Sequence, residues 1–472
     1  MNFQYYCPKC KKELVFVKSD LHCKNCLIDY IQEDNCIVFK NHDFSYISDN
    51  NKLIKKLLDE IKKEGYETAV NKFLNSNNEF QSQLINTEYD KSVDVIFHGI
   101  GKNYTRCLDI KSGLGNKAEI LSNIFKEVFT IEFEDYYIEF QKKRFKEKGC
   151  SNISITKCNL LRLPFPDNFF DLILCNGILD NINKVSNEND QGKIQEQLIK
   201  ELKRVTNEKG TIIFGVNNTN INEKFKKILK NSKNLKQNFS EYISILENNE
   251  LRVNPLWVLP SYDQPLYSGE INDNISLKSF FRNISTFMSN FRGGKHQNDV
   301  KEFLLTFLKK IDYPFIKNIL ETFSPSFVFC CTKNEINDSI VNWIKKETGY
   351  ENILRMSRHE KILFMLLNIK GKIEKVVFIK RYGYNFPNEI KKYERKYPNL
   401  NEPSERIWIT DWIRGEPINP NNQEEVNLMI KWLIDFQKSK RKEIMDKEYV
   451  KKEINQMKKK IKRTWTSRLL KI

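Results

Sequence analysis

The chain has 472 residues, of which 40% are hydrophobic and 29% are charged, and it contains 17 glycines and 13 prolines. This composition excludes wholesale disorder and long glycine- or proline-rich linkers, and the length allows about two to four domains of roughly 100–200 residues. The formal net charge of +17 favours a phosphate-bearing partner, such as nucleic acid, a phosphorylated glycan or an anionic membrane surface, or else reflects a general richness in lysine.

The N-terminus does not predict export. Residues 1–6 are not a basic segment followed by an apolar run, and no apolar stretch reaches the roughly 20 residues that span a bilayer. We therefore expect a cytoplasmic protein, with peripheral attachment to a membrane as an additional possibility. In that compartment the 11 cysteines are expected to be metal ligands or buried thiols instead of disulfides.

Residues 1–40 predict a zinc ribbon. Two Cys-x-x-Cys pairs follow one another closely, and their members are Cys7, Cys10, Cys23 and Cys26. Four thiolates close a tetrahedral Zn²⁺ site without an open position, so the expected role of the metal is structural. Residues 13–17 and 28–39 are expected to be strands, with Cys36 as a buried thiol outside the site. A redox-active cysteine pair is the alternative, which the doubled motif disfavours.

A helical connector and then a βα alternation follow the ribbon. Residues 41–90 form the connector, in which apolar residues at helical spacing predict one helix over 52–74. From residue 106 short apolar runs alternate with helical segments, which predicts an open parallel sheet. The expected strands are 106–110, 128–131, 153–155, 170–175 and 210–215, and the expected helices are 116–125, 136–148 and 197–205.

Glycines and polar residues follow the first three of these strands. In an open parallel sheet, ligands bind outside the carboxyl ends of the strands. Gly113 and Gly115 follow the first strand, where they let the backbone approach a ligand closely. Glu132 ends the second strand, where a carboxylate can accept both hydroxyls of a ribose. Asn159 follows the third strand and can meet the edge of an adenine.

Two stretches carry a family resemblance: Leu108-Asp109-Ile110-Lys111-Ser112-Gly113-Leu114-Gly115 and Leu163-Pro164-Phe165-Pro166-Asp167-Asn168-Phe169-Phe170-Asp171. The chain resembles the class I S-adenosylmethionine-dependent methyltransferases, in particular the type 11 family, over about residues 90–216. The resemblance implies an α/β Rossmann-like fold, S-adenosylmethionine as the cofactor, and a closing strand near 326–332. It also implies site roles: the methionine end for Asp109, Gly113 and Gly115, the ribose for Glu132, the adenine for Asn159 and Leu160, and the pocket floor for Cys175 and Asn176.

Two positions depart from that family's pattern. Lys111 stands where the family has the first glycine of the loop, and Asn159 stands where it usually has an acidic residue. The asparagine carbonyl can still pair with the adenine amino group. Lys111 places a side chain where backbone normally approaches the cofactor, so an inactive Rossmann fold is one alternative and a dinucleotide-binding domain is another.

Residues 91–333 are expected to form the methyltransferase unit, with an insertion over 217–325. The insertion is expected to be mostly helical, with helices over 224–235 and 299–311. By resemblance such insertions carry acceptor specificity, so Tyr262 and Asp263 are acceptor-site candidates, with a surface turn as the alternative. Asp180, just beyond the fourth strand, is the candidate group that takes a proton from an acceptor. A helix N-cap is its alternative role.

Residues 334–445 resemble part of the N-terminal lobe of aminoglycoside phosphotransferase-like or choline kinase-like kinases. Lys380 would contact ATP phosphates, with Glu389 or Glu394 as its helix partner. No His-Gly-Asp-like catalytic loop follows, so we expect a truncated, split or degenerate module, with a separate catalytic lobe as a partner in the split case. An unrelated α+β domain is the alternative. The expected elements are strands at 362–367 and 374–382, a strand ending in a turn over 406–417, and helices at 387–397 and 427–436.

Residues 446–472 form a basic tail, which predicts either a contact with an anionic surface or RNA, or a solvated helix end. For the whole chain, the sequence predicts S-adenosylmethionine-dependent methyl transfer to a small-molecule or glycan-linked acceptor. The expected partner is therefore a small molecule or a saccharide. An RNA methyltransferase and a catalytically inactive scaffold are the alternatives. Against the RNA hypothesis, no interleaving of aromatic and basic residues marks a base-stacking surface.

Overall fold

The computed structural model describes much of the chain between residues 4 and 411. It divides the chain into two compact units, 1–412 and 413–472, and all described residues lie in the first unit. The described residues are 4–17, 20–33, 36–39, 51–75, 94–100, 104–184, 190–218, 237–263, 265–280, 317–318, 320–321, 324, 326–334, 339–358, 361–380, 394–396 and 406–411.

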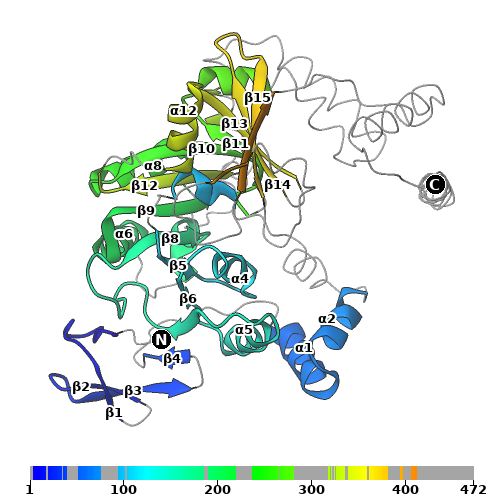
Figure 1. Cartoon of the computed structure of the whole chain (residues 1–472). Helices are drawn as coiled ribbons and strands as arrows, with labels where there is room; N and C mark the ends of the chain where they lie inside the picture. Colours follow the sequence, from blue (N-terminus) through cyan, green and yellow to red (C-terminus); the bar gives the residue numbers. More distant parts are fainter. Residues whose placement is uncertain are drawn as a thin grey trace, which may run out of the picture. The chain divides into compact units, whose positions relative to one another are not determined.

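The centre of the sheet is parallel (Figure 1), and strand pairing joins five strands there. The strand order reverses between β5 (Arg106–Ile110) and β8 (Phe170–Asn176), which is the switch point where ligands bind in open α/β sheets. β12 (Ser326–Thr332) pairs antiparallel with β9 (Thr206–Asn217), so the predicted parallel strands and the predicted closing strand are all confirmed. In spatial order the parallel strands are β7 (Ile153–Lys157), β6 (Glu127–Ile131), β5 (Arg106–Ile110), β8 (Phe170–Asn176) and β9 (Thr206–Asn217).

Hydrophobic clusters cover both faces of this sheet, because side chains alternate between the faces along a strand. Leu108 and Ile110 of β5 belong to a cluster that includes the apolar face of α6 (Gln191–Val205). Cys107 belongs to a second cluster, with α4 (Asn116–Leu121) and α5 (Asp135–Glu147). The predicted helices are thus confirmed with shifted ends. In particular, α6 begins earlier than expected because the Asp190 side chain accepts a hydrogen bond from the Lys193 amide and caps it.

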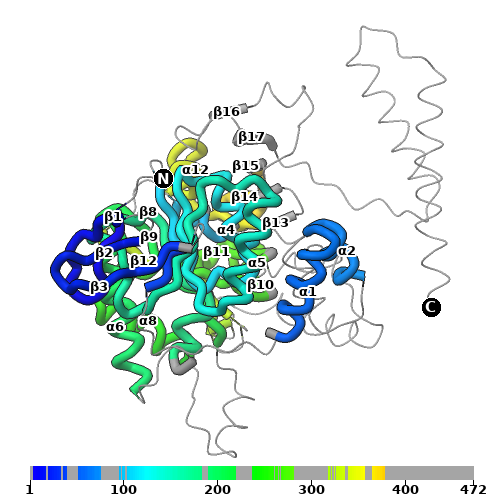
Figure 2. The backbone as a smooth tube through the Cα atoms, turned by 90° about the horizontal axis from the view of Figure 1, so that it is seen from below, coloured from blue at the N-terminus to red at the C-terminus, as the bar shows by residue number. Residues whose placement is uncertain are grey.

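The connector contains two helices where the sequence analysis predicted one. α1 (Asn51–Glu64) and α2 (Tyr66–Leu74) are separated by Gly65, whose φ of +83° is incompatible with a continuous helix. Both helices pack against α5 (Figure 2). The Tyr66 and Phe140 rings lie 5.7 Å apart. The predicted helical conformation of this segment is therefore confirmed, but the break at Gly65 was not predicted.

The ribbon strands extend the sheet on one side. β1 (Val15–Val17), β2 (Asp20–Cys23) and β3 (Ile28–Glu33) are antiparallel neighbours, and β3 also pairs with β4 (Cys36–Val38). β4 then pairs in parallel with β7 of the central sheet. The ribbon is therefore joined to the α/β sheet by main-chain hydrogen bonds.

Further antiparallel strands extend the sheet beyond β12, through β10 (Arg252–Pro260) and β11 (Pro265–Glu270). These two strands lie inside the insertion that the sequence predicted to be mostly helical, so that expectation is wrong for 252–270. Trp257 is fully buried on one face of β10, while Leu256 and Val258 are buried on the other. This alternation is typical of a strand buried on both faces. The helices expected over 224–235 and 299–311 fall outside the described residues.

The strands after residue 334 continue the same sheet. β13 (Asn352–Arg358) pairs with β11, and it is followed by β14 (Lys361–Leu367) and β15 (Ile373–Lys380). The predicted pairing of 362–367 with 374–382 is thus confirmed within the described residues, as is the predicted strand β17 (Arg406–Asp411), next to β15. The helix expected over 387–397 is wrong at its end, because β16 (Glu394–Lys396) pairs with β17.

Other C-terminal expectations remain predictions. Lys380 ends β15, whereas Glu389, the helix over 427–436 and the basic tail lie outside the described residues. The kinase-like character of 334–445 therefore stays a prediction. In the part of the chain that the structure describes, no helix is long and apolar enough to cross a membrane.

Candidate functional site

The loop between β5 and α4 turns sharply at the carboxyl end of the sheet. Lys111, Gly113 and Gly115 all have left-handed backbone conformations, with φ of +56°, +57° and +80°. The Lys111 amide donates to the Ile131 carbonyl at 2.8 Å, which ties the loop to the end of β6. A Cβ added at Gly113 would meet nothing within 4 Å, so there is open space beside the loop at this glycine.

Asp109 lies in β5, two residues before this loop. Its side chain is only 3% exposed, and its buried Oδ2 has no hydrogen-bond partner among the described residues. Burial raises the pKa of Asp109 from its ordinary 3.8 to about 7, against an opposing effect of Lys117. A buried carboxylate without partners is unstable by itself. The site therefore offers a buried acceptor position to a cationic or hydrogen-bond-donating ligand.

Glu132 follows β6 and is 2% exposed. Its Oε2 accepts the Gly113 amide at 2.8 Å, and its Oε1 accepts the Phe133 amide at 2.7 Å. Burial raises the pKa of Glu132 to about 7, although these backbone hydrogen bonds act to lower it. Asp109 and Glu132 thus place two buried acids around one glycine loop, at the ends of neighbouring strands.

Gln141 of α5 supports the loop, and the sequence analysis did not single it out. Its amide nitrogen donates to Ser112 Oγ at 2.8 Å and to the Gly113 carbonyl at 2.6 Å, and its amide oxygen accepts from Thr130. The signal was present in the sequence, since Gln141 lies at four-residue spacing between the buried residues Tyr137 and Phe145. A polar residue on the buried face of a helix needs an internal partner.

Gly115 is expected to be intolerant of a side chain. A Cβ there would lie 2.8 Å from the Phe145 ring, and the φ of +80° is unfavourable for L-residues. We expect Gly115→Ala to lower the free energy of unfolding by about 2–4 kcal/mol in urea titrations. Gly149→Ala is the control, because Gly149 is also left-handed but has open space around it; it should cost only about 1 kcal/mol.

Asn159 and Leu160 lie just after β7, as predicted. The Asn159 side-chain oxygen accepts the Leu161 amide at 2.7 Å, and its carbonyl accepts the Arg162 amide at 3.1 Å, so Asn159 organises the turn that it begins. Leu160 is fully buried. In this state the Asn159 oxygen already has a partner, and its side-chain amide group is the donor that remains for a ligand.

Cys175 and Asn176 end β8, and Cys175 is fully buried. Beyond them Gly177 adopts a φ of +67°, and a Cβ there would lie 2.5 Å from the Tyr262 hydroxyl. A Cβ at Gly215 on β9 would likewise lie 2.6 Å from the Tyr262 ring. The two glycines therefore make room for Tyr262, which is 8% exposed and comes from the turn between β10 and β11.

Asp180 lies in the 3₁₀ helix η2 (Leu179–Lys184). Its Oδ2 accepts from the Asn217 side chain at 2.8 Å and from the Asn217 amide at 3.2 Å, whereas its buried Oδ1 has no hydrogen-bond partner among the described residues. The Asp180 side chain thus accepts its hydrogen bonds from Asn217 at the end of β9. Burial, together with Asp263 and Asp180, raises the pKa of Tyr262.

The two acceptor candidates of the insertion differ in their surroundings. Tyr262 is buried against β8 and β9, whereas the Asp263 side chain is 64% exposed and its Oδ1 lies 3.6 Å from Lys117 Nζ on α4. The turn that carries them therefore reaches from the ends of β8 and β9 to the helix after the glycine loop. A plain surface turn does not account for the burial of Tyr262.

The four cysteines of the ribbon converge. The sulfurs of Cys7, Cys10, Cys23 and Cys26 all lie within 4.8 Å of one another, with 4.0 Å between Cys7 and Cys26 and 3.5 Å between Cys10 and Cys23. Tetrahedral coordination with Zn–S bonds of about 2.3 Å separates sulfurs by roughly 3.8 Å. The donor set and its spacing therefore fit a tetrahedral metal ion.

Comparison with known proteins bears on the central sheet. Residues 108–214 match the methyltransferase domain family. No curated protein matches the chain by sequence. Among solved structures with partial similarity, YcgJ from Bacillus subtilis is 18% identical over 50% of this chain and 92% of its own, with a TM-score of 0.30. An S-adenosylmethionine-dependent methyltransferase from Aquifex aeolicus is 18% identical over 40% of this chain and 92% of its own, with a TM-score of 0.28. A Haemonchus contortus phosphoethanolamine N-methyltransferase 2 bound to S-adenosyl-L-methionine is 15% identical over 59% of this chain and 60% of its own, with a TM-score of 0.32. Residues 108–214 thus match the methyltransferase domain family in sequence, and the strand order of this region is that of a Rossmann-like α/β fold.

Proposed function

We propose that this domain binds S-adenosylmethionine and transfers its methyl group to a small-molecule or glycan-linked acceptor. The observation that carries the proposal is the pair of buried acids, Asp109 and Glu132, on either side of a glycine loop at the switch point of the sheet. Such a pair can hold the two polar ends of a nucleoside-containing cofactor. Asp109 would accept a hydrogen bond from the cofactor's ammonium group, and Glu132 would accept the ribose hydroxyls.

Lys111 is compatible with this proposal. The residue adopts the left-handed conformation that a glycine would take, and its amide is bonded to the Ile131 carbonyl. The path of the loop backbone is therefore maintained despite the side chain. This geometry favours an active cofactor site over the inactive fold that the substitution could otherwise produce.

The acceptor would lie on the side of the site formed by Asp180, Asn217 and Tyr262. Methyl transfer from a sulfonium is an in-line displacement, so positioning of the acceptor supplies much of the rate. The Oδ1 of Asp180, which has no hydrogen-bond partner among the described residues, would take a proton from an acceptor hydroxyl or amine. Because Tyr262 is buried against β8 and β9, we favour an acceptor that can enter a narrow site.

We also propose that the four cysteines bind a structural zinc ion. The set contains four thiolates and no open position, which is the pattern of structural instead of catalytic zinc. The ribbon comprises short strands only, so the metal would provide stability that its small core cannot.

The test of the cofactor proposal is a calorimetric titration of the zinc-loaded chain with S-adenosylmethionine and S-adenosylhomocysteine. Saturable binding with one site per chain is expected. Glu132→Gln should weaken the affinity by about 10–100-fold, because a charged acceptor is replaced by a neutral amide. Glu127→Gln is a suitable control. Glu127 begins β6, the strand that Glu132 follows, and it pairs with Arg106 at the end of β6 that lies away from Glu132. Absence of binding to the wild-type chain at millimolar cofactor would overturn the proposal.

A further inference from the structure

We infer that the metal-bound ribbon positions the adenine-side segment of the methyltransferase site, so that metal binding and cofactor binding are thermodynamically coupled. The inference rests on the proposed function, since it assumes that the cysteines bind zinc and that Asn159 and Leu160 flank the cofactor. The segment concerned is 157–165, which runs from the end of β7 past these two residues. The ribbon contacts the main chain of this segment at both of its ends.

The first end is held by strand pairing. β4 lies parallel to β7, with Cys36 opposite Ile155 and Val38 opposite Lys157. The ladder is extended by the Phe39 amide, which donates to the Lys157 carbonyl at 2.9 Å. This bond lies only two residues before Asn159, so the ribbon fixes the point at which the adenine-side turn leaves the sheet.

The second end is held by the first cysteine knuckle and the residues before it. The Tyr6 amide donates to the Pro164 carbonyl at 3.0 Å, and Lys11 Nζ donates to the Leu163 carbonyl at 3.2 Å. The buried Tyr5 ring lies 5.8 Å from the Phe165 ring. Tyr5, Tyr6 and Lys11 thus fix the segment on the far side of Leu160.

These contacts depend on the fold of the knuckle. Lys11 directly follows Cys10 and has a left-handed φ of +57°, which is uncommon for a lysine. The turn is closed by hydrogen bonds from the Lys11 amide to the Cys7 carbonyl and from the Cys7 amide to the Lys12 carbonyl, both at 2.8 Å. A metal ion that joins the sulfurs of Cys7 and Cys10 would stabilise this turn, and without the ion no bond would join these two side chains.

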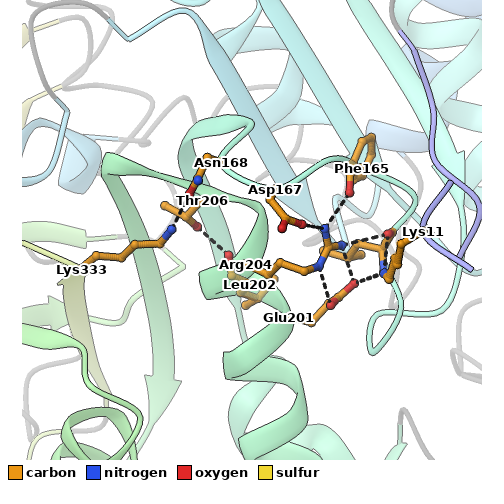
Figure 3. A network of polar contacts seen from close by, with 10 residues as sticks. Lys11, Phe165, Asp167, Asn168, Glu201, Leu202, Arg204, Thr206 and Lys333 are labelled. Atoms are coloured by element: carbon orange, nitrogen blue, oxygen red, sulfur yellow. Dashed lines mark hydrogen bonds and ion pairs between the residues drawn. The ribbon is translucent and has the colours of Figure 1, made fainter. Parts of the chain in front are cut away.

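Glu201 joins Lys11 to the segment through hydrogen bonds to both (Figure 3). Its Oε1 accepts from Lys11 Nζ at 2.7 Å and from the Leu163 amide at 2.6 Å. Arg204 pairs with Glu201 and donates to the Phe165 carbonyl at 2.9 Å. The same carboxylate therefore joins the cysteine knuckle, helix α6 and the segment, so loss of the knuckle fold would remove one of its cationic partners.

Coupling of this kind is reciprocal. If metal binding raises the affinity for the cofactor by some factor, the cofactor raises the affinity for the metal by the same factor. Coupling factors between sites in proteins are commonly about 5–150-fold. Two linked effects are therefore expected, one on the affinity for the cofactor and one on the affinity for the metal, and each can be measured separately.

The first experiment compares the zinc-loaded chain with the same chain stripped by a chelator. We expect the dissociation constant of S-adenosylhomocysteine to rise at least about fivefold on stripping, and hydrogen exchange to increase over residues 157–165. We also expect saturating S-adenosylhomocysteine to slow the release of zinc to a colorimetric chelator. Circular dichroism of the stripped chain shows whether the central sheet stays folded.

The second experiment keeps the metal and removes one contact. Lys11→Met retains all four cysteines but cannot donate to Glu201 or Leu163, and Lys9→Met is the control, because Lys9 is an exposed residue of the same knuckle. We expect Lys11→Met to bind one zinc ion and to weaken S-adenosylhomocysteine binding about three- to tenfold, with Lys9→Met unchanged. Equal cofactor affinity in the loaded, stripped and Lys11→Met chains would overturn the inference and leave the proposed function intact. Failure of the loaded wild-type chain to bind cofactor would instead overturn the proposed function, and this inference with it.

Discussion

Substitution of Glu201 by alanine is expected to lower the free energy of unfolding by about 3–5 kcal/mol. The Glu201 carboxylate accepts hydrogen bonds from Lys11, Arg204 and the Leu163 amide. Removing it leaves two partly buried cations and a buried amide without their acceptor. A broken buried network of this kind costs more than the network contributes when intact, because the remaining charges keep their desolvation penalty.

The titration of Glu201 adds a pH signature. Burial acts to raise the pKa of Glu201, but the hydrogen bonds from Arg204 and Lys11 outweigh it, so the pKa lies below its ordinary 4.5. For Lys11, burial outweighs the hydrogen bond to Glu201 and the attraction of Glu201 and Asp167, so the pKa of Lys11 is lowered. A carboxylate with a lowered pKa stabilises the fold above its unfolded pKa, and this contribution is lost as the pH falls below 4.5.

Urea titrations at pH 7 and pH 4 test this prediction. The difference between wild type and Glu201→Ala should be large at pH 7 and should shrink toward pH 4 and below. Glu196→Ala is the matched control, since Glu196 lies on the same helix and makes an exposed pair with Lys200; its effect should stay within about 0.5 kcal/mol. A Glu201 variant as stable as this control would show that the network adds nothing to the fold.

The central sheet could be predicted because each of its strands and helices is marked by a pattern within a short stretch of sequence. Short apolar runs separated by helical periodicity mark β5 to β9 and their helices, and the strand ends follow from the same runs. The four cysteines were predictable for the same reason, since a doubled Cys-x-x-Cys pattern has few other physical explanations. The residues that the resemblance assigned to the cofactor all lie at or just beyond the carboxyl ends of β5, β6, β7 and β8.

The features that the sequence analysis missed depend on contacts between distant segments. Nothing near Glu201 indicates that Lys11, 190 residues away, is its partner. The pairing of β4 with β7 and the burial of Tyr262 against Gly177 are likewise tertiary choices that no local pattern encodes. β10 was missed because an apolar run buried on both faces has no strict alternation of polar and apolar residues.

The substitution Asp109→Asn is expected to stabilise the ligand-free protein and to weaken cofactor binding about 100-fold. The carboxylate is buried, and its Oδ2 has no hydrogen-bond partner among the described residues. An amide of the same shape removes a buried charge, which stabilises the fold, but it also removes the anion proposed to face the ammonium group of the cofactor. Charge-assisted hydrogen bonds of this kind account for about 1.5–3 kcal/mol each.

The gain in stability should depend on pH in a defined way. Because burial raises the pKa of Asp109 from 3.8 to about 7, the folded state retains a proton that the unfolded state has already released between these values. The stability of the wild type therefore falls as the pH rises through this window, and it is lowest above about pH 7. Asparagine does not titrate, so Asp109→Asn should match the wild type near pH 4 and exceed it by about 1–3 kcal/mol at pH 8.

Unfolding in urea at pH 4.5, 6 and 8, with calorimetric cofactor titrations at pH 6 and 8, tests both parts. Cofactor affinity of the wild type should increase from pH 6 to pH 8, because larger fractions of Asp109 and Glu132 are ionised, and this increase should be smaller in Asp109→Asn, where only Glu132 contributes to it. Asp59→Asn is the control, since Asp59 is an exposed acid on α1. If Asp109→Asn bound the cofactor as tightly as the wild type, Asp109 would have no role in binding, and the burial of its carboxylate would need another explanation.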